Sequence, residues 1–126
     1  MSVIGLDHYN LRGTREQLES LREFYKDVLG LTDGDRPTFN SFGYWLYAGE
    51  RAILHLSEST QEETPLSTGG SSFNHAAFRC SGRQDFEEKL EGMGIGFSTG
   101  HVPGTAIVQL FFSDPAGNGV ELSFTD

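Results

Sequence analysis

Four side chains able to bind a metal ion occupy matching places in the two halves of this sequence. His8 precedes His55 by nearly the same interval as His75 precedes Glu121. Neutral imidazole and carboxylate groups suit divalent zinc, iron, nickel, cobalt or manganese. If the two halves face each other, these four side chains are the predicted ligands of one metal site.

The expected directions of the side chains agree with this hypothesis without deciding it. Successive side chains on a strand point to opposite faces, so His55 lies opposite Leu54 and Leu56. Glu121 likewise lies opposite Leu122. Both polar residues then point away from the apolar face that packs under a helix. The alternative is that the histidines bond to the backbone and that Glu121 is a solvated strand residue, because ligands so far apart in the chain carry no local signature.

An internal repeat predicts two similar frameworks to position these residues. REFYKDVLGL at 22–31 aligns without a gap with FEEKLEGMGI at 86–95, and both segments close with a glycine between two apolar residues. Apolar residues at helical spacing predict a helix over 15–29, with Thr14 as its N-cap, and a second helix over 83–93.

Short β-rich runs surround each predicted helix. In chain order, the predicted strands cover residues 3–11, 39–49, 50–58, 73–80, 106–112 and 119–124. The chain is therefore expected to be a single domain, 1–126, built from the modules 1–58 and 72–126. A segment rich in Ser, Thr, Glu and Gly, residues 59–71, is the predicted linker.

Composition excludes several classes of partner. At 126 residues and 13.9 kDa the chain suits one compact domain, and its formal net charge of −9 disfavours nucleic acid. No apolar run approaches the roughly 20 residues of a membrane span. The lone Cys80 and the lack of a recognisable signal peptide lead us to expect a reducing, cytoplasmic location, and no nucleophile role is expected for Cys80.

Three segments resemble a known family. GLDHYNLRGTREQLESLREFYKDVLGL, NHAAFRC and LFFSDPAGNGVELSF are similar to the vicinal oxygen chelate superfamily, which includes glyoxalase I, methylmalonyl-CoA epimerase, extradiol dioxygenases, and fosfomycin and bleomycin resistance proteins. The resemblance spans essentially the whole chain. It implies an α+β fold, two βαβββ modules forming an incomplete barrel around a divalent metal ion, usually in a homodimer.

The resemblance also implies roles for individual residues. The metal ligands of the family fall on His8, His75 and Glu121, and the remaining ligand position falls on His55. Glyoxalase I has a glutamate there and the epimerase a glutamine, so neither activity transfers directly. His55 is then a fourth ligand or a base beside the metal, and Glu121, the only carboxylate of the set, is the other catalytic candidate. Without His55, the other three match the two-histidine, one-carboxylate triad of iron oxygenases.

The expected function is a metal-dependent enzyme that performs lyase, isomerase or dioxygenase chemistry on a small molecule. The metal would chelate two neighbouring substrate oxygens and stabilise the negative charge that develops on them. The alternative is a non-catalytic drug-binding protein of the bleomycin resistance type, although such proteins generally lack these ligands. The substrate, the metal, the reaction, and whether the modules pair within one chain or between chains stay open.

Side chains near the predicted ligands are candidates for contact with the substrate. They are Trp45, Tyr47, Gln109 and Phe111, each with core packing as the alternative. Arg51 and Arg79 are weighed as contacts for an anionic substrate, with surface charge as the alternative. His101 has no counterpart in the repeat and is expected not to be a ligand.

Overall fold

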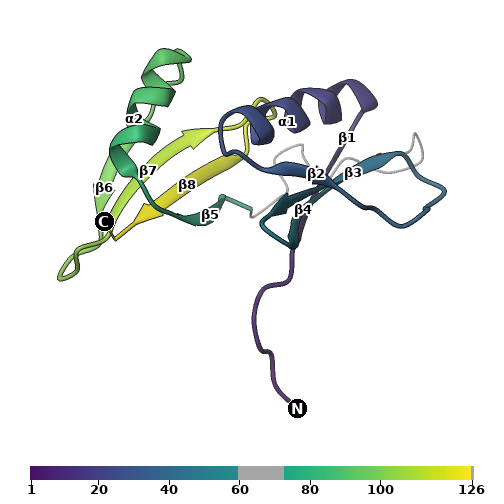
Figure 1. The fold of residues 1–126 in the computed structure, drawn as a ribbon, viewed down its shortest axis with the longest axis horizontal. Coiled ribbons are helices and arrows are strands. Elements are labelled where there is room, and N and C mark those ends of the chain that lie inside the picture. Colours follow the sequence, from purple (N-terminus) through teal and green to yellow (C-terminus); the bar gives the residue numbers. More distant parts are fainter. Residues whose placement is uncertain (60–72, 126) are drawn as a thin grey trace. The chain divides into compact units, whose positions relative to one another are not determined.

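A computed structural model describes residues 1–59 and 73–125 of the chain (Figure 1). The chain divides into two compact units, Met1–Pro65 and Leu66–Asp126. Apart from Ser59, the predicted linker 59–71 lies outside the described residues.

The two units have the same order of elements. Unit 1 contains β1 (Tyr9–Gly13), α1 (Arg15–Asp27), β2 (Thr32–Gly34), β3 (Gly43–Ala48) and β4 (Arg51–Glu58). Unit 2 contains β5 (His75–Cys80), α2 (Arg83–Gly92), β6 (Ser98–His101), β7 (Val108–Ser113) and β8 (Gly119–Phe124). The predicted α+β class with two βαβββ modules is therefore confirmed.

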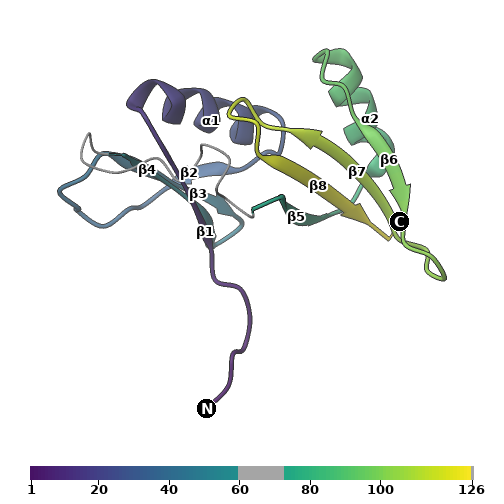
Figure 2. The same ribbon diagram turned by 180° about the vertical axis from the view of Figure 1, so that it is seen from behind.

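Each unit builds one four-stranded mixed sheet. The strand orders are β1-β4-β3-β2 and β5-β8-β7-β6, and neither sheet closes on itself within the described residues. The first strand of each unit runs parallel to the last strand, whereas the other neighbours are antiparallel. Each first strand thus lies beside the last strand of its own unit (Figures 1 and 2).

The first helix begins where the sequence predicts. The Thr14 side chain accepts a hydrogen bond from the Gln17 backbone N–H at 3.2 Å, and the Gln17 side chain accepts one from the Thr14 N–H at 3.0 Å. This reciprocal capping box satisfies two N–H groups that the helix itself leaves unpaired. After the helix, Gly30 has a φ of +76°, a conformation that glycine adopts without strain.

Each helix covers one face of its sheet. The buried apolar residues of unit 1 come from the α1 segment (Leu18, Leu21, Tyr25, Val28), from Leu31 after it and from the strands (Leu46, Leu54, Leu56). In unit 2, α2 contributes Leu90 and the strands contribute Leu110, Phe112, Val120, Leu122 and Phe124. The strand residues that alternate with these buried ones lie on the opposite face of each sheet.

The strand predictions differ from the structure in several places, and the run predicted over 39–49 is a strand only over Gly43–Ala48. The first strand begins at Tyr9 rather than at residue 3, and the preceding Val3 and Ile4 are almost fully exposed. The short strands β2 and β6 were not predicted. Both are edge strands whose residues are mainly exposed, so no alternation of apolar and polar residues marks them in the sequence.

The capping box gives a direct test of helix α1. Replacing Thr14 with alanine leaves the Gln17 N–H without its side-chain acceptor, and we expect the free energy of unfolding to fall by about 1 kcal/mol. Urea denaturation measures this change. Thr38→Ala, at an exposed loop position, is the matched control and should change stability by less than about 0.5 kcal/mol. Equal stability of the two variants would contradict a role for the cap.

Candidate functional site

In unit 1, His55 lies at the centre of a stack of three rings. It is paired across the sheet with Trp45 on β3 and with Asn10 on β1. The His55 ring stacks on the His8 ring with centroids 3.8 Å apart, and on the Trp45 ring with centroids 4.0 Å apart. Because β1 and β3 flank β4, the His55 ring is held between the other two on the face away from α1.

The hydrogen bonds of the two histidines leave one ring nitrogen of each for a ligand. His55 Nε2 lies 3.2 Å from the Ala52 carbonyl oxygen, which only accepts, so Nε2 carries the proton and Nδ1 of the neutral ring keeps its lone pair. His8 Nδ1 donates to the Asp7 carboxylate at 2.7 Å, which leaves Nε2. A carboxylate behind a histidine is a frequent support for a metal ligand.

The surroundings of His55 keep its ring neutral. Burial is the main cause that lowers the pKa of His55 from 6.5, and electrostatic interactions with His8 and Arg36 lower it further. The ring is therefore uncharged at neutral pH. Neutral imidazole is the form that binds a metal ion or accepts a proton.

In unit 2, His75 and Glu121 form a second pair of donors. His75 Nε2 lies 3.2 Å from Glu121 Oε1. The other carboxylate oxygen accepts a hydrogen bond from Gln109 Nε2 at 3.2 Å, and the Phe111 ring meets the His75 ring edge-on. Glu121 is only 8% exposed, although it lies on the face opposite the buried Leu122. Its carboxylate is thus held between neighbouring strands rather than solvated.

Both ring nitrogens of His75 face oxygen atoms. Nδ1 lies 2.7 Å from the Asn74 side-chain oxygen, and Nε2 faces Glu121. A neutral ring carries one N–H, so it can donate to only one of these two oxygen atoms. Two ligands of one zinc-like ion lie about 3 Å apart when each bond is about 2.0 to 2.1 Å. The 3.2 Å separation therefore fits two adjacent metal ligands as well as a charged hydrogen bond.

The register shows that the two pairs are equivalent. Trp45 lies opposite His55 as Phe111 lies opposite Glu121. On the other side, Asn10 and Ala77 occupy matching places, and His8 and His75 stand two residues before them. Within the described part of the chain, no three His, Cys, Asp or Glu side chains cluster as a metal site. Each unit by itself therefore supplies two of the four predicted ligands.

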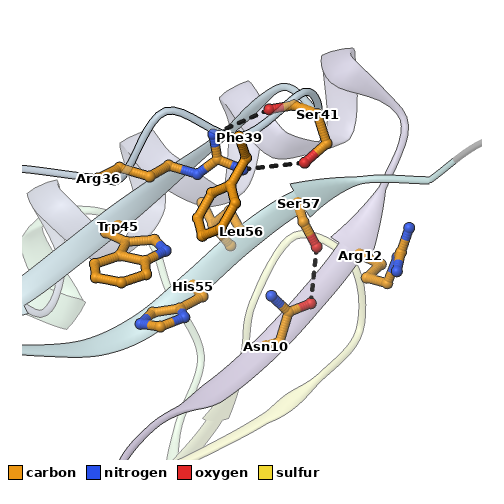
Figure 3. Close-up of a pocket in the computed structure, with 9 residues that line it drawn as sticks. All are labelled: Asn10, Arg12, Arg36, Phe39, Ser41, Trp45, His55, Leu56 and Ser57. Carbon is orange, nitrogen blue, oxygen red and sulfur yellow. Dashed lines mark hydrogen bonds between the residues drawn. The ribbon is translucent and has the colours of Figure 1, made fainter.

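A pocket of about 260 Å³ opens beside His55 in unit 1 (Figure 3). Its walls include Trp45, Phe39 and the guanidinium of Arg36, which donates to the Ser41 carbonyl oxygen at 3.0 Å and to the Ser41 hydroxyl at 3.3 Å. Of the predicted substrate contacts, only Trp45 lines this pocket. Gln109 and Phe111 instead contact the unit 2 pair.

The remaining candidates lie elsewhere. The Tyr47 hydroxyl donates to the Asp35 carbonyl oxygen at 2.6 Å, and His101 is exposed at the end of β6. Burial raises the pKa of the Cys80 thiol, which disfavours the reactive thiolate. Arg51 lies outside the pocket, and it donates to the Leu6 carbonyl oxygen.

The sequence analysis did not identify Arg36 as a candidate residue, although Gly43 in the predicted strand indicated a close approach of other groups. A side chain at Gly43 would clash with the Leu56 carbonyl oxygen and would meet the Arg36 guanidinium at 3.0 Å. A glycine inside a strand often marks such a close approach. The guanidinium therefore packs where a larger residue on β3 would displace it.

Comparison with known proteins identifies the family. Residues 5–122 match the model of the Glyoxalase/Bleomycin resistance protein/Dioxygenase superfamily. The chain belongs to this superfamily. It is 36% identical over 107 residues to a protein named Glyoxylase I 4 from Arabidopsis thaliana. The aligned region covers 82% of this chain and 62% of that relative. The chain thus spans about three fifths of the length of this relative.

Solved structures share the fold. A lactoylglutathione lyase from Agrobacterium tumefaciens matches with a TM-score of 0.72 and 19% identity, over 98% of this chain and 96% of that one. An antibiotic-binding protein from Streptomyces sp. CB03234 matches with a TM-score of 0.70 and 16% identity, over 100% of this chain and 99% of that one. The superfamily fold therefore occurs in proteins described as an enzyme and as a binding protein. In the described residues, no helix has the length and apolarity to cross a membrane.

The stack in unit 1 predicts the titration of His55. In protein treated with a chelator, we expect NMR spectra of the ring to give a pKa below 6.5, because the folded environment disfavours the charged ring. The unfolded chain then binds the proton first, so this group stabilises the fold above about pH 6.5, and that stabilisation is lost as the pH falls through the lower folded pKa. His8→Gln removes the electrostatic effect of His8 and should raise the pKa of His55. A wild-type pKa at or above 6.5 would contradict this description.

Proposed function

We propose that this chain is a metal-dependent enzyme that performs lyase or isomerase chemistry on a small molecule with two neighbouring oxygen atoms. The observation that carries the proposal is the equivalent pairing of donors in the two units, His8 with His55 and His75 with Glu121. In this proposal, the two pairs together hold one divalent ion. When bound, the ion supplies a Lewis acid for the negative charge that develops on a substrate oxygen.

The residues of the chain itself divide the remaining tasks. Glu121 is the only carboxylate among the four donors, so it is the group proposed to move a substrate proton. The hydrogen bond from the Gln109 side chain orients the Oε2 atom of Glu121. His55 is proposed as the fourth ligand, through the Nδ1 atom that its bond to the Ala52 carbonyl leaves unprotonated. The aromatic walls, Trp45 and Phe111, would exclude water from the site.

The fourth donor favours a lyase or isomerase over a dioxygenase. Two histidines and one carboxylate leave positions for both substrate and oxygen on an iron ion, whereas a ligand from His55 reduces that space. The relative named Glyoxylase I 4 supports this choice. Oxygen uptake during turnover would instead favour the dioxygenase, and a chain that binds no metal would favour drug binding without catalysis.

Metal analysis of the purified protein tests the proposal. Protein prepared without chelators is expected to contain about one divalent ion per four-ligand site. Inductively coupled plasma mass spectrometry measures the metal content. His8→Ala, His55→Ala and Glu121→Gln should each lower metal affinity by about 100-fold or more, because loss of a group that merely supports a ligand already costs about 10- to 100-fold.

The fourth histidine of the chain provides the matched control. His101→Ala removes an exposed imidazole outside both pairs and should leave metal affinity unchanged. Unchanged affinity in His55→Ala, with loss of activity, would make His55 a base rather than a ligand. No stoichiometric metal in the wild type, and none taken up on titration, would overturn the proposed function.

Activity requires a probe with adjacent oxygens. The hemithioacetal of methylglyoxal and glutathione has a hydroxyl group next to a carbonyl group. NMR in D₂O follows both its isomerisation and the exchange with solvent of the hydrogen on the carbon that carries the hydroxyl group. We expect Glu121→Gln to lower the rate of exchange by about 100-fold, within the range for loss of a general base. Full exchange in this variant would assign proton transfer to another group.

Mixed assemblies decide which pairs combine in the proposed homodimer. One chain carries His8→Ala and His55→Ala, and the other carries His75→Ala and Glu121→Gln. If the site joins pairs of different chains, a co-expressed mixture regains metal binding that neither chain shows alone. If the site forms within one chain, the mixture regains none.

A further inference from the structure

We infer that the pocket of unit 1 binds the anionic end of a ligand, a carboxylate carried on a flat apolar group, with Arg36 as the residue that contacts the carboxylate. That this ligand is the substrate rests on the proposed function, because the pocket adjoins His55. The inference narrows the substrate class to small organic acids. It is independent of which metal is bound.

The Arg36 guanidinium is held in place by hydrogen bonds that use only some of its N–H groups. Each of its terminal nitrogens makes one hydrogen bond to Ser41, and its guanidinium lies 4.8 Å from the centre of the Phe39 ring. Each terminal nitrogen carries two N–H groups, so one on each is not used by these bonds. Either of these N–H groups can donate a charge-assisted hydrogen bond to a carboxylate oxygen.

The pocket around Arg36 is positively charged, although the chain as a whole is acidic. Two other arginines of unit 1 pair with carboxylates, Arg15 with Glu58 and Arg22 with Asp33. Within the described residues, no ion pair joins Arg36 to an acidic side chain. The residues that line the pocket include no Asp or Glu. A chain with a net charge of −9 thus presents a positively charged pocket, which favours an anionic ligand.

Aromatic rings supply the apolar part of the pocket. Phe39 is 50% exposed, and its ring centre lies 6.3 Å from that of Trp45. Both rings line the same pocket as Arg36, as Figure 3 shows. The volume of about 260 Å³ is below the roughly 300 to 1,000 Å³ of pockets for drug-sized ligands. An acid with a single ring is therefore the size of molecule that the pocket accommodates.

Intrinsic fluorescence gives a local readout, because Trp45 is the only tryptophan of the chain. Benzoate is the probe and benzamide is its uncharged counterpart, titrated at constant ionic strength. We expect a saturable change with benzoate and at least tenfold weaker binding of benzamide, because a hydrogen bond to a charged group contributes more than one to a neutral group. Equal affinity for benzoate and benzamide, or no saturable binding of benzoate, would overturn the inference.

Substitutions locate the contact. Arg36→Gln should weaken benzoate binding at least tenfold, and Arg36→Lys should fall between it and the wild type because lysine keeps the charge but loses the planar fork. Arg51→Gln removes the same charge from unit 1 outside the pocket and should leave the affinity unchanged. Equal losses in Arg36→Gln and Arg51→Gln would overturn the inference. If Arg36→Gln fails to fold, the comparison of benzoate with benzamide in the wild type decides.

Metal-loaded and chelator-treated proteins separate this inference from the proposed function. Benzoate binding at Arg36 should persist in both, because no predicted ligand contributes to the guanidinium contact. A protein that binds benzoate but no metal would refute the proposed function alone. The pocket inference alone would be refuted by a protein that binds metal, binds benzoate and benzamide equally well, and keeps its benzoate affinity in Arg36→Gln.

Discussion

The parallel pairing of the first and last strands in each unit is the constraint on which both donor pairs depend. A parallel pair cannot be joined by a tight turn, so a long crossover that includes a helix must separate the two strands in sequence. In unit 1 the pairing brings the start of β1 beside the middle of β4, and it places His8 against His55. The same pairing of β5 with β8 places His75 against Glu121.

The crossover helix also decides which face of each sheet is available for chemistry. Because α1 and α2 bury the leucine-rich faces, the alternating residues of β4 and β8 are turned to the other side. A histidine or a glutamate there does not interrupt the apolar core. The same alternation that stabilises each unit therefore presents its polar donors, and neither requirement competes with the other.

Small differences between equivalent positions give the two units different chemistry. Gly43 and Gln109 occupy the same place in their sheets, opposite Ser57 and Ser123. In unit 2 the glutamine side chain bonds to Glu121, whereas in unit 1 the glycine leaves room for Arg36. Unit 1 thus combines a neutral histidine with a cationic pocket, and unit 2 combines a histidine with a buried carboxylate.

Local patterns in the sequence determined much of this arrangement. The capping residue Thr14, the helical spacing after it and the alternation around Glu121 each depend on neighbours within a few positions, so the helices, the main strands and the outward direction of Glu121 were predictable. The internal repeat added which positions correspond. The edge strands β2 and β6 were not predictable because they bury little and therefore carry no apolar pattern.

Only the tertiary structure decided which side chains touch. The stack of His55 between His8 and Trp45 depends on strand register, and the place of Arg36 depends on how an irregular loop returns over Gly43. Such contacts join residues far apart in the chain, and their geometry follows from pairing and packing rather than from local preference. The sequence by itself thus determined which residues have the chemistry to bind a ligand, and the fold decided which of them lie together within each unit.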